Sequence, residues 1–599
     1  MSYEIREQDV LVIGAGGAGL RAAIEASLQG CSVGLVCKSL LGKAHTVMAE
    51  GGVAASLGNV DARDTWQVHF RDTMRGGKLL NNWRMAQIHA QESPARVNEL
   101  EAWGAVFDRT KEGKILQRNF GGHRYPRLAH VGDRTGLEII RTLQDFAVHQ
   151  ENIEVYMECT ITHLLKDGDK ICGALGYWRT TGEFILFKAK AVVIATGGVG
   201  KSYRITSNSW EYTGDGQALA CRAGADLMDM EFLQFHPTGM VWPLSVKGTL
   251  VTEGVRGEGG VLKNNKGERF MFKYVPDMFK GEFAETEDEA KRWLAGDKNA
   301  RRPPELLTRD VVAKAINAEV KAGRGSPHGG VFLDIASQLN AETIKKKLPS
   351  MYHQFKELAN VDITKEPMEV GPTAHYIMGG IRVEAETAVT TVAGIYAAGE
   401  AAAGMHGANR LGGNSLSDLL VFGRRAGLGA SQHAKNTTGK LAVDTKQVEE
   451  YITQALKPFE QKTGENPFTV MEDLQKAMER CVGIVREEKE LVEALQEIAK
   501  LKVRAKNVKA QGDKAYNPGW HCCLDLPNML IVSEAIAKAA LERKESRGGH
   551  TRIDYPNTEA EFGKINFVIR KKGDELKVAT EPLPQMPAEL QTIISEDSK

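Results

Sequence analysis

A glycine-rich turn between an apolar strand and an apolar helix is the feature that most constrains the fold of this chain. Residues 9–13 (DVLVI) are typical of a buried strand, residues 20–28 carry apolar side chains at helical spacing, and residues 31–37 (CSVGLVC) predict a second strand. The turn after the first strand reads GAGGAG and contains Gly14, Gly16, Gly17 and Gly19. Such a strand–turn–helix–strand unit holds the pyrophosphate of a dinucleotide at the N-terminus of its helix. The sequence therefore predicts a Rossmann-like nucleotide-binding fold.

Two more apolar strands that end in glycine turns lie far downstream, at residues 191–198 and 394–400. We therefore expect an α/β chain in which the Rossmann-like domain is discontinuous, because segments far apart in the sequence supply its strands. The expected division is a first part of this domain, an inserted α+β capping domain, the return of the first domain, a C-terminal helical domain and a final segment, at residues 1–235, 236–352, 353–436, 437–550 and 551–599.

The helical domain is predicted from apolar residues that recur every three or four positions after residue 437, as they do on the buried face of packed helices. Pro527 is expected in the first turn of the last of these helices, which should run to about residue 544. His521, Cys522 and Cys523 are adjacent, but their spacing fits no standard metal site. We interpret them as packing residues and expect no metal.

The composition of the 599 residues excludes several classes of protein. Basic and acidic side chains balance at 77 each, so nucleic acid is not expected as the main partner. No apolar run approaches the ~18 residues that a membrane-spanning helix needs, and the first residues lack the apolar core of a secretory signal. The 8 cysteines include no C-x-x-C pair, which argues against a disulfide scaffold and against an iron–sulfur cluster within the chain.

A series of short motifs gives a more specific indication than the fold alone. The motifs occur in this order: His45-Thr46, Glu50-Gly51-Gly52, TGDG at 213–216, EFLQFHPTG at 231–239, TEGVRGEGG at 252–260, Arg309-Asp310, HYIMGG at 375–380, HGANRLGGNSL at 406–416 and ESRGGH at 545–550. Each motif alone is weak, but the ordered set resembles the flavoprotein subunits of succinate dehydrogenase and fumarate reductase over nearly the whole chain. The sequence around residues 43–46 and 119–123 is most similar to the actinobacterial type of succinate dehydrogenase.

The resemblance implies that the Rossmann-like domain binds FAD, with a covalent bond to His45. The residues implied to contact FAD are Gly14, Gly16, Gly17, Gly19, Lys38, Ser39, Lys43, His45, Thr46, Glu50, Gly52, Asp215, Glu400, Ser415 and Leu416. The acidic residue that commonly holds a ribose hydroxyl after the second strand is absent, since Lys38 and Ser39 stand there, and this weakens a plain NAD interpretation. By the same resemblance, a histidyl bond raises the potential of the flavin, which helps the oxidation of an unactivated pair of C–H bonds.

The resemblance also implies a dicarboxylate substrate, succinate or fumarate, that exchanges hydride with the flavin N5 of FAD. The implied substrate contacts are Gly51, Phe120, His236, Thr252, His375 and Arg410. Cationic and hydrogen-bonding groups at both ends suit a dicarboxylate, and arginine can hold a carboxylate in a bidentate way. Arg309 is implied as the catalytic acid or base, with Glu253 and Arg256 as its relay. Because the reference pKa of arginine is above about 12, Arg309 needs such a relay to reach the right charge state.

Partner subunits are expected because the chain shows no cluster or haem motif that could carry electrons away from the flavin. The resemblance implies an iron–sulfur subunit, together with membrane anchor subunits through which the complex meets quinone. The chain itself is then expected as a peripheral subunit on the cytoplasmic side of the cell membrane. The sequence leaves open the direction of catalysis, the quinone, the number of anchor subunits and the oligomeric state.

Two other functions stay open at this point. L-Aspartate oxidase has the same fold and many of the same motifs, but it usually lacks the His before Thr46 and reads MASNSL where residues 411–416 read LGGNSL. His45 and the LGG of residues 411–413 therefore favour the dehydrogenase. The second alternative is a non-catalytic flavin-binding module, and the residues that argue against it are His236, Arg309, His375 and Arg410.

Overall fold

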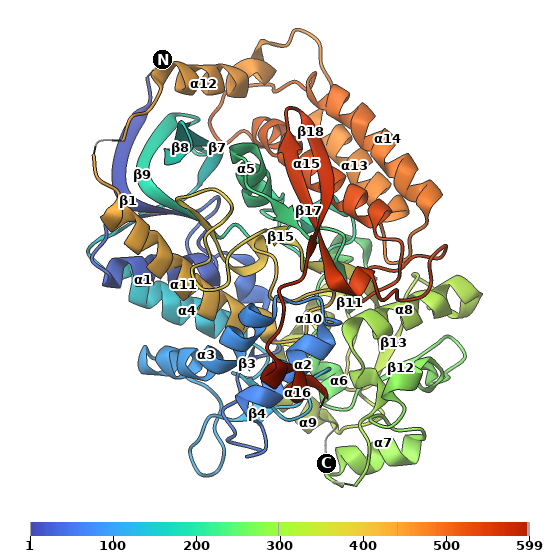
Figure 1. Cartoon of the computed structure of the whole chain (residues 1–599). Coiled ribbons are helices and arrows are strands. Elements are labelled where there is room, and N and C mark those ends of the chain that lie inside the picture. Colours follow the sequence, from blue (N-terminus) through green and yellow to red (C-terminus); the bar gives the residue numbers. More distant parts are fainter. Residues whose placement is uncertain (1, 298, 440, 596–599) are drawn as a thin grey trace.

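The computed structural model describes residues 2–297, 299–439 and 441–595. Its largest sheet carries the glycine-rich turn and lies at the left of Figure 1. The strand order is β6 (Ile153–Tyr156), β2 (Val33–Val36), β1 (Glu4–Ile13), β9 (Phe184–Ile194), β8 (Lys170–Trp178) and β7 (Cys159–Asp167), and β16 (Ile395–Ala397) also pairs with β9. The pairs among β1, β2, β6, β9 and β16 are parallel, whereas β7, β8 and β9 pair antiparallel. The predicted discontinuous Rossmann-like domain is therefore confirmed.

The glycine-rich turn allows β1 and the following helix to approach closely. The helix is α1 (Gly17–Leu28), and it packs against α4 (Thr135–Val148) and α11 (Asn414–Asn436), while α3 (Trp83–Ala102) packs on α11. Gly14 has a φ of +107°, and a Cβ atom there would lie 2.3 Å from the carbonyl oxygen of Ala195. A Cβ atom on Gly19 would lie 1.7 Å from the carbonyl oxygen of Gly14. Glycine is therefore required at both positions.

A second hydrophobic core is built by the segment at the lower right of Figure 1. Its antiparallel sheet has the order β11 (Leu233–Met240), β14 (Met368–Ile377), β13 (Val331–Asp334) and β12 (Val261–Lys263). The helices of this segment are α6 (Gly254–Gly257), α7 (Glu287–Leu294), α8 (Arg309–Glu319), α9 (Ala341–Lys347) and α10 (Pro349–Ala359). The buried residues of this core run from Met240 to Val370. We therefore propose that the capping domain extends past residue 352.

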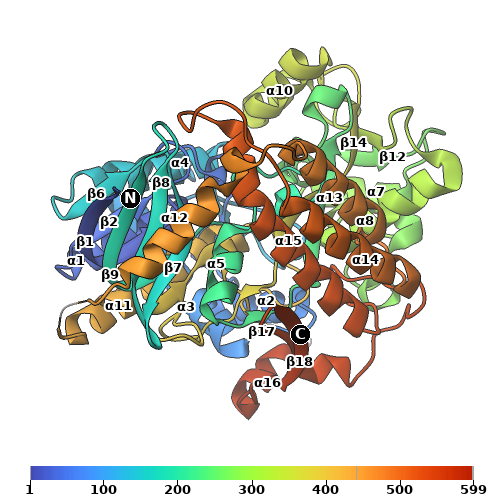
Figure 2. The same cartoon turned by 90° about the horizontal axis from the view of Figure 1, so that it is seen from above.

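The predicted C-terminal helical domain is present, with one helix starting earlier than expected. Its helices are α12 (Thr445–Glu460), α13 (Pro467–Cys481), α14 (Glu488–Ala505) and α15 (Pro518–Glu542). Figure 2 shows α13, α14 and α15 grouped together, with α12 on the side of β7. The prediction that Pro527 occupies the first turn of the last helix is wrong, because Pro527 lies inside α15. Pro518 occupies the first turn instead, and the Asn517 side chain caps it by accepting from the Trp520 amide at 2.9 Å.

The C-terminal segment returns across the molecule. Its hairpin of β17 (Ile565–Lys572) and β18 (Glu575–Pro582) extends a sheet with β10 (Leu227–Met228) and β15 (Gly380–Ile381). Helix α16 (Ala588–Ser595) then packs on α2 (Trp66–Gly76), where Leu590 joins a small core with Phe70 and Met74. The remaining sheet is β3 (Val53–Ala54), β5 (Leu128–Ala129) and β4 (Gln117–Arg118), and α5 (Asp215–Ala223) begins within the TGDG motif of residues 213–216.

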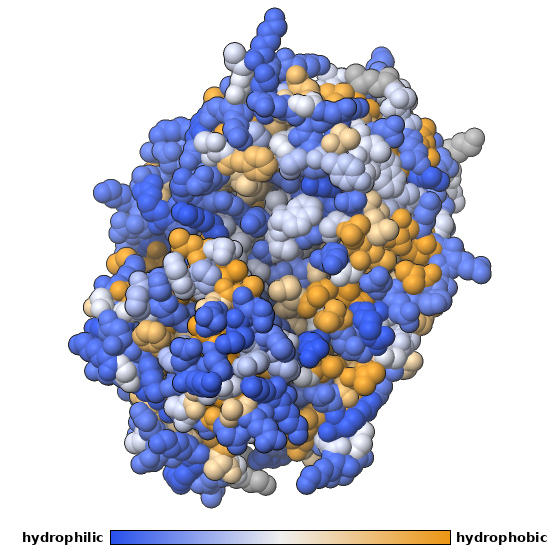
Figure 3. Space-filling model, turned by 180° about the vertical axis from the view of Figure 1, so that it is seen from behind, coloured by the Kyte–Doolittle hydropathy of each residue, from blue (hydrophilic) through white to orange (hydrophobic). Residues whose placement is uncertain are grey.

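The surface is mainly hydrophilic, as Figure 3 shows for one face, with hydrophobic residues gathered in patches across the middle of that view. Large apolar side chains that stay exposed include Leu40, Met48, Trp210, Trp242 and Leu244. Among the described residues, no helix combines the length and the apolar character that crossing a bilayer requires.

Candidate active site

A cavity lies where the glycine-rich turn, the sheet of β11, β14, β13 and β12 (the capping sheet) and the start of α11 meet. Its empty volume is about 1600 Å³, including the part open to solvent. The predicted site residues that line it are Gly14, Gly16, Gly17, Lys38, Ser39, His45, Thr46, Glu50, Gly51, Gly52, Phe120, Asp215, His236, Thr252, Glu253, Arg309, His375, Glu400, Arg410, Ser415 and Leu416. Gly19 packs behind Gly14, and Arg256 lies behind Glu253. Lys43 is exposed outside the lining, so its contact with a cofactor stays a prediction.

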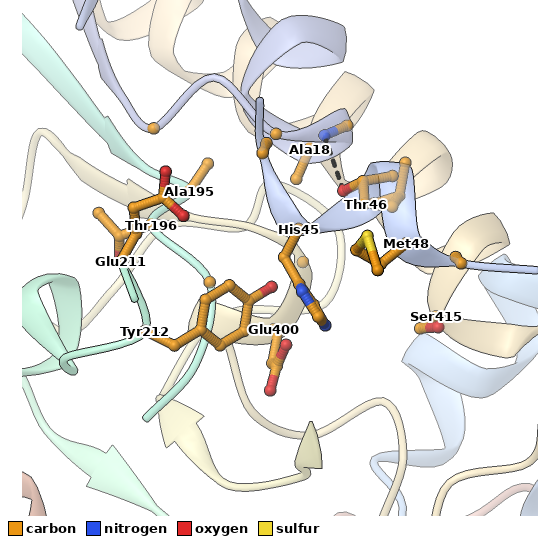
Figure 4. A pocket seen from close by; sticks show the side chains of 18 of the residues that line it. Ala18, His45, Thr46, Met48, Ala195, Thr196, Glu211, Tyr212, Glu400 and Ser415 are labelled. Atoms are coloured by element: carbon orange, nitrogen blue, oxygen red, sulfur yellow. Dashed lines mark hydrogen bonds between the residues drawn. The ribbon is translucent and has the colours of Figure 1, made fainter. Parts of the chain in front are cut away.

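His45 begins a short 3₁₀ turn, and its ring enters the cavity beside Tyr212 and Glu400 (Figure 4). The ring centroids of His45 and Tyr212 are 4.9 Å apart. The Asn208 amide donates to Nε2 of His45 at 3.2 Å, while Nδ1 of His45 has no hydrogen-bond partner among the described residues. Removal from water lowers the pKa of His45 to about 4, so the imidazole is neutral near pH 7. Because Nε2 of the neutral ring accepts the hydrogen bond from Asn208, Nδ1 carries the proton and Nε2 carries the lone pair that a nucleophile needs.

Two histidines meet at the capping side of the cavity. His236 lies on β11 and His375 on the paired strand β14, and their ring centroids are 5.0 Å apart. The Ser207 hydroxyl lies 2.7 Å from Nδ1 of His375, which fixes that ring. Burial holds the pKa of both histidines well below the usual range, and Arg309 adds to this effect by its positive charge. Both rings are therefore neutral near pH 7, and Nδ1 of His236 already donates to the Thr238 carbonyl oxygen at 2.9 Å.

Positive charge in the cavity comes from two buried arginines. Arg410 donates from Nη1 to the Ser415 hydroxyl at 3.0 Å, and its guanidinium carbon lies 4.3 Å from the centroid of the Tyr376 ring. Burial lowers the pKa of Arg410 to about 9, with a smaller contribution from the charge of Arg309. Nε of Arg410 has no hydrogen-bond partner within the described chain. A carboxylate ligand could satisfy this donor.

The predicted relay forms a contiguous set of buried contacts. Arg309, the first residue of α8, donates from Nε to Oε2 of Glu253 at 2.8 Å. Nη2 of Arg256 lies 3.6 Å from the same oxygen, and Nη1 of Arg256 donates to the carbonyl oxygen of Glu305 at 2.5 Å. Burial would raise the pKa of Glu253, but the charges of Arg309 and Arg256 outweigh it and hold that pKa below the usual value. Glu253 is therefore a carboxylate between two guanidinium groups.

Phe120 contributes an apolar ring to the cavity wall near Arg309. A Cβ atom on Gly412 would lie 2.4 Å from the Phe120 ring, and one on Gly51 would lie 2.7 Å from it. The LGG sequence at 411–413 therefore leaves room for an aromatic ring beside Arg309, because any side chain at Gly412 would displace the ring.

Gln234 is a site residue that the sequence did not reveal. Its Oε1 accepts from Nη1 of Arg309 at 3.3 Å and from Nη2 of Arg410 at 3.1 Å. Its Nε2 donates to Asn409 at 3.0 Å and to the Arg410 carbonyl oxygen at 2.7 Å, so the amide orientation is fixed. Gln234 precedes His236 by two positions in a strand, which places both on one face of β11. That spacing is the signal that could have identified it.

Replacing Gln234 with leucine is expected to raise the KM for a dicarboxylate by roughly tenfold, because a buried donor left unpaired costs about 1–3 kcal/mol. The substitution leaves Arg309 and Arg410 without their shared acceptor, so both can move away from the productive position. Steady-state kinetics with succinate measures the effect, and Gln475→Leu, at a buried glutamine that donates to the Lys201 carbonyl oxygen at 2.8 Å outside the cavity, is the matched control. An unchanged KM in the Gln234 variant would contradict this role.

The residues present fit FAD. Gly14 and Gly19 build the tight turn that a dinucleotide pyrophosphate needs, and Gly16 lies in the cavity wall. Within the described residues, Nδ1 of His45 and Oε2 of Glu50 are buried and lack a hydrogen-bond partner. A bound group with both donors and acceptors could satisfy them.

Comparison with known proteins agrees with this geometry. The family described as FAD binding domain matches residues 9–416, and the family Fumarate reductase flavoprotein C-term matches residues 471–593. One polypeptide of the fumarate reductase (CoM/CoB) of Methanothermobacter marburgensis is 43% identical over 95% of this chain and 98% of its own length. The succinate dehydrogenase flavoprotein subunit of Coxiella burnetii is 37% identical over 92% of this chain and 93% of its own.

Solved structures are similar over almost the whole chain. Mycobacterium smegmatis Sdh1 in complex with UQ1 is 58% identical with a TM-score of 0.84, and the match covers 98% of this chain and 95% of that one. The FrdA chain of E. coli quinol fumarate reductase is 33% identical with a TM-score of 0.90, and the match covers 98% of both chains. This chain therefore belongs to the flavoprotein family of succinate dehydrogenase and fumarate reductase, whose members are FAD-dependent oxidoreductases.

Proposed function

We propose that this chain is the flavoprotein subunit that interconverts succinate and fumarate. The observation that carries the proposal is that Arg309 and Arg410, which both line the cavity that holds the glycine-rich turn, donate to one acceptor, Gln234. Two buried cations and two neutral histidines match a ligand with a carboxylate at each end. Family members named for either direction of the reaction support this substrate pair.

Different residues of this chain would bind the substrate and transfer the proton. Arg410 and the neutral rings of His236 and His375 would bind and orient the two carboxylates, which places the reacting carbons against one face of the cavity. FAD, when bound, supplies the group that accepts or donates the hydride. Arg309 would take the proton from the neighbouring carbon during oxidation and return it during reduction. Glu253 and Arg256 would carry that proton to and from Arg309, since Glu253 contacts both arginines and lies between them in space.

His45 is proposed as the covalent attachment point of FAD, because its neutral ring enters the cavity and keeps a lone pair on Nε2. His45→Ala is expected to bind FAD without a covalent bond and to lose more succinate oxidation than fumarate reduction, since the bond raises the flavin potential. Flavin fluorescence of the chain after denaturing electrophoresis measures the bond. The exposed His149→Ala is the control. Fluorescence that survives in the His45 variant would place the bond elsewhere.

The partners are part of the same proposal. Electrons would pass to an iron–sulfur subunit, then to quinone through membrane anchor subunits, with this chain peripheral on the cytoplasmic side of the membrane. Two solved relatives support a quinone as the final acceptor or donor, since one is described in complex with UQ1 and another with menaquinol molecules.

A dye-linked assay of the flavin-loaded chain tests the proposal, with succinate and L-aspartate supplied separately. We expect dye reduction with succinate, competitive inhibition by malonate, and no reaction with L-aspartate. Reaction with L-aspartate alone would support the oxidase alternative instead. A dithionite-reducible flavin that reacts with neither substrate, also after addition of the iron–sulfur subunit, would support a non-catalytic module.

A further inference from the structure

A buried ion cluster joins the C-terminal helical domain to the cavity at the end away from the arginines. Lys38 follows β2, the position at which dinucleotide-binding folds place the residue nearest the adenosine ribose. Lys38 and Asp215 both line the cavity, and Asp525 reaches them from α15, which lies 487 positions away from Lys38 in the sequence. None of the sequence motifs includes Asp525.

The ammonium group of Lys38 uses all of its donors within this cluster. It donates to Thr213 Oγ1 at 3.0 Å, to Asp215 Oδ2 at 2.9 Å and to Asp525 Oδ1 at 2.7 Å. An ammonium group has three N–H donors, so none is left for a phosphate. Lys38 therefore acts as a bridge between two carboxylates, one on α5 at the cavity and one on α15.

A second contact from α15 reinforces the first. Asn528 lies one turn after Asp525, and its amide donates to Oδ1 of Asp215 at 2.8 Å. The Oδ1 atom of Asn528 accepts from Nη1 of Arg222 at 2.7 Å, which fixes the amide orientation. Each oxygen of Asp215 thus accepts from a group in contact with or on α15, Oδ2 from Lys38 and Oδ1 from Asn528. Thr213 also donates to Oδ1 at 2.9 Å, and the Asp215 side chain is only 10% exposed.

The packing of α15 at the cavity depends on the charges of Lys38, Asp215 and Asp525. Two carboxylates and one ammonium group are buried together, and each would be costly to bury without the others. If α15 moves away, Lys38 and Asp215 lose partners at the cavity wall. If Lys38 and Asp215 are not in place, Asp525 is a buried carboxylate without its cation. The wall at the adenosine end and the position of α15 are therefore linked.

We propose that Asp525 is a cofactor-positioning residue, through which α15 orders the adenosine end of the FAD site. The consequence is reciprocal: docked α15 favours FAD binding, and bound FAD stabilises the docked helix. The inference rests on FAD binding and does not depend on the identity of the substrate.

Asp525→Asn in a His45→Ala parent tests this, because the parent binds FAD reversibly and gives a defined Kd. We expect the Kd for FAD to rise by roughly 5- to 150-fold, the usual range of a coupling between two sites. We also expect FAD to protect the amides of α15 from hydrogen exchange in the parent and to protect them less in the variant. Titration by flavin fluorescence and hydrogen-exchange mass spectrometry measure the two effects.

Two further variants separate positioning from general destabilisation. Lys38→Gln removes the same ion pair from the other side, so the double variant should weaken FAD binding by less than the product of the single effects. Glu534→Gln removes a carboxylate from the same helix that pairs with Lys502 and Lys538 away from the cavity, and it should leave the Kd unchanged.

An unchanged Kd in Asp525→Asn, or an equal loss in Glu534→Gln, would overturn the inference. If Asp525→Asn does not fold, Asn528→Leu decides, because it removes the other contact from α15 to Asp215 and Asn528 does not line the cavity; an unchanged Kd there would overturn the inference as well. A His45→Ala parent that binds no FAD would instead contradict the FAD site itself, which is a distinguishable result.

Discussion

Succinate turnover is expected to fall by at least roughly 10²–10⁴-fold when Arg309 is replaced by alanine, which is the usual contribution of a positioned acid or base. The guanidinium group lies in the cavity wall and is bonded to Glu253 at 2.8 Å, so the variant removes the proton acceptor and disconnects the relay. The measurement is kcat for succinate, corrected for the FAD content of each preparation. KM should change less than kcat, because Arg410 stays in place to bind the carboxylate.

Arg324→Ala is the matched control, since Arg324 also lies in the capping domain and pairs with a buried glutamate, Glu319, outside the cavity. The control should keep its turnover. Near-normal turnover in Arg309→Ala would rule out the assigned role, and an equal loss in the control would point to general damage of the capping domain.

Arg410→Gln is expected to weaken malonate binding by roughly 10²–10⁴-fold, because breaking a buried ion pair costs about 3–5 kcal/mol. Arg410 supplies a carboxylate-binding cation whose Nε has no partner among the described residues, so a ligand carboxylate would gain this interaction. Titration of the flavin absorption with malonate measures the Kd. Arg424→Gln, at a partly exposed arginine of α11 that pairs with Glu25, is the control. Malonate binding within a few fold of the parent would contradict the assignment.

The pH dependence gives an independent check of the same residue. Because burial lowers the pKa of Arg410 to about 9, the group is charged below pH 9 and loses its charge as the pH rises through that value. Malonate affinity should therefore be constant between about pH 7 and 8 and should fall above pH 9. The fall should be absent in Arg410→Gln, whose side chain does not titrate. A parent profile that stays flat to pH 10 would contradict the shifted pKa.

The fold could be predicted mainly where local patterns decide it. The run of β1, the glycine turn and α1 follows from a short apolar strand, a turn that only glycine fits, and helical spacing over the next residues. The start of α15 was not predictable in the same way. Pro527 is typical of a first turn, but the cap at Asn517 and Pro518 lies earlier, and the apolar residues on both sides of Pro527 give no clear boundary.

In the site, too, the sequence predicts residues that lie in local motifs but not the contacts between distant segments. The candidate residues were predictable because they lie in motifs of fixed spacing, and most of them line the cavity. Their mutual contacts were not predictable, since His236 and His375 meet only because β11 pairs with β14, with His236 opposite Thr373. Gln234 lies in the motif of residues 231–239, but its contact with Arg410 is distant in sequence and could not be predicted. Asp525 was missed because it acts through Lys38, and a single polar residue in a helix gives no local signal of such a partner.

Anaerobic titration of the purified, flavin-loaded chain with succinate tests the central claim most directly. The account predicts that succinate bleaches the absorption of the oxidised flavin, that one fumarate forms per flavin reduced, and that malonate prevents both. Arg309→Ala should retain the malonate-induced spectral change and lose the bleaching. Bleaching by L-aspartate but not by succinate, or a flavin that dithionite reduces and succinate does not, would contradict the account.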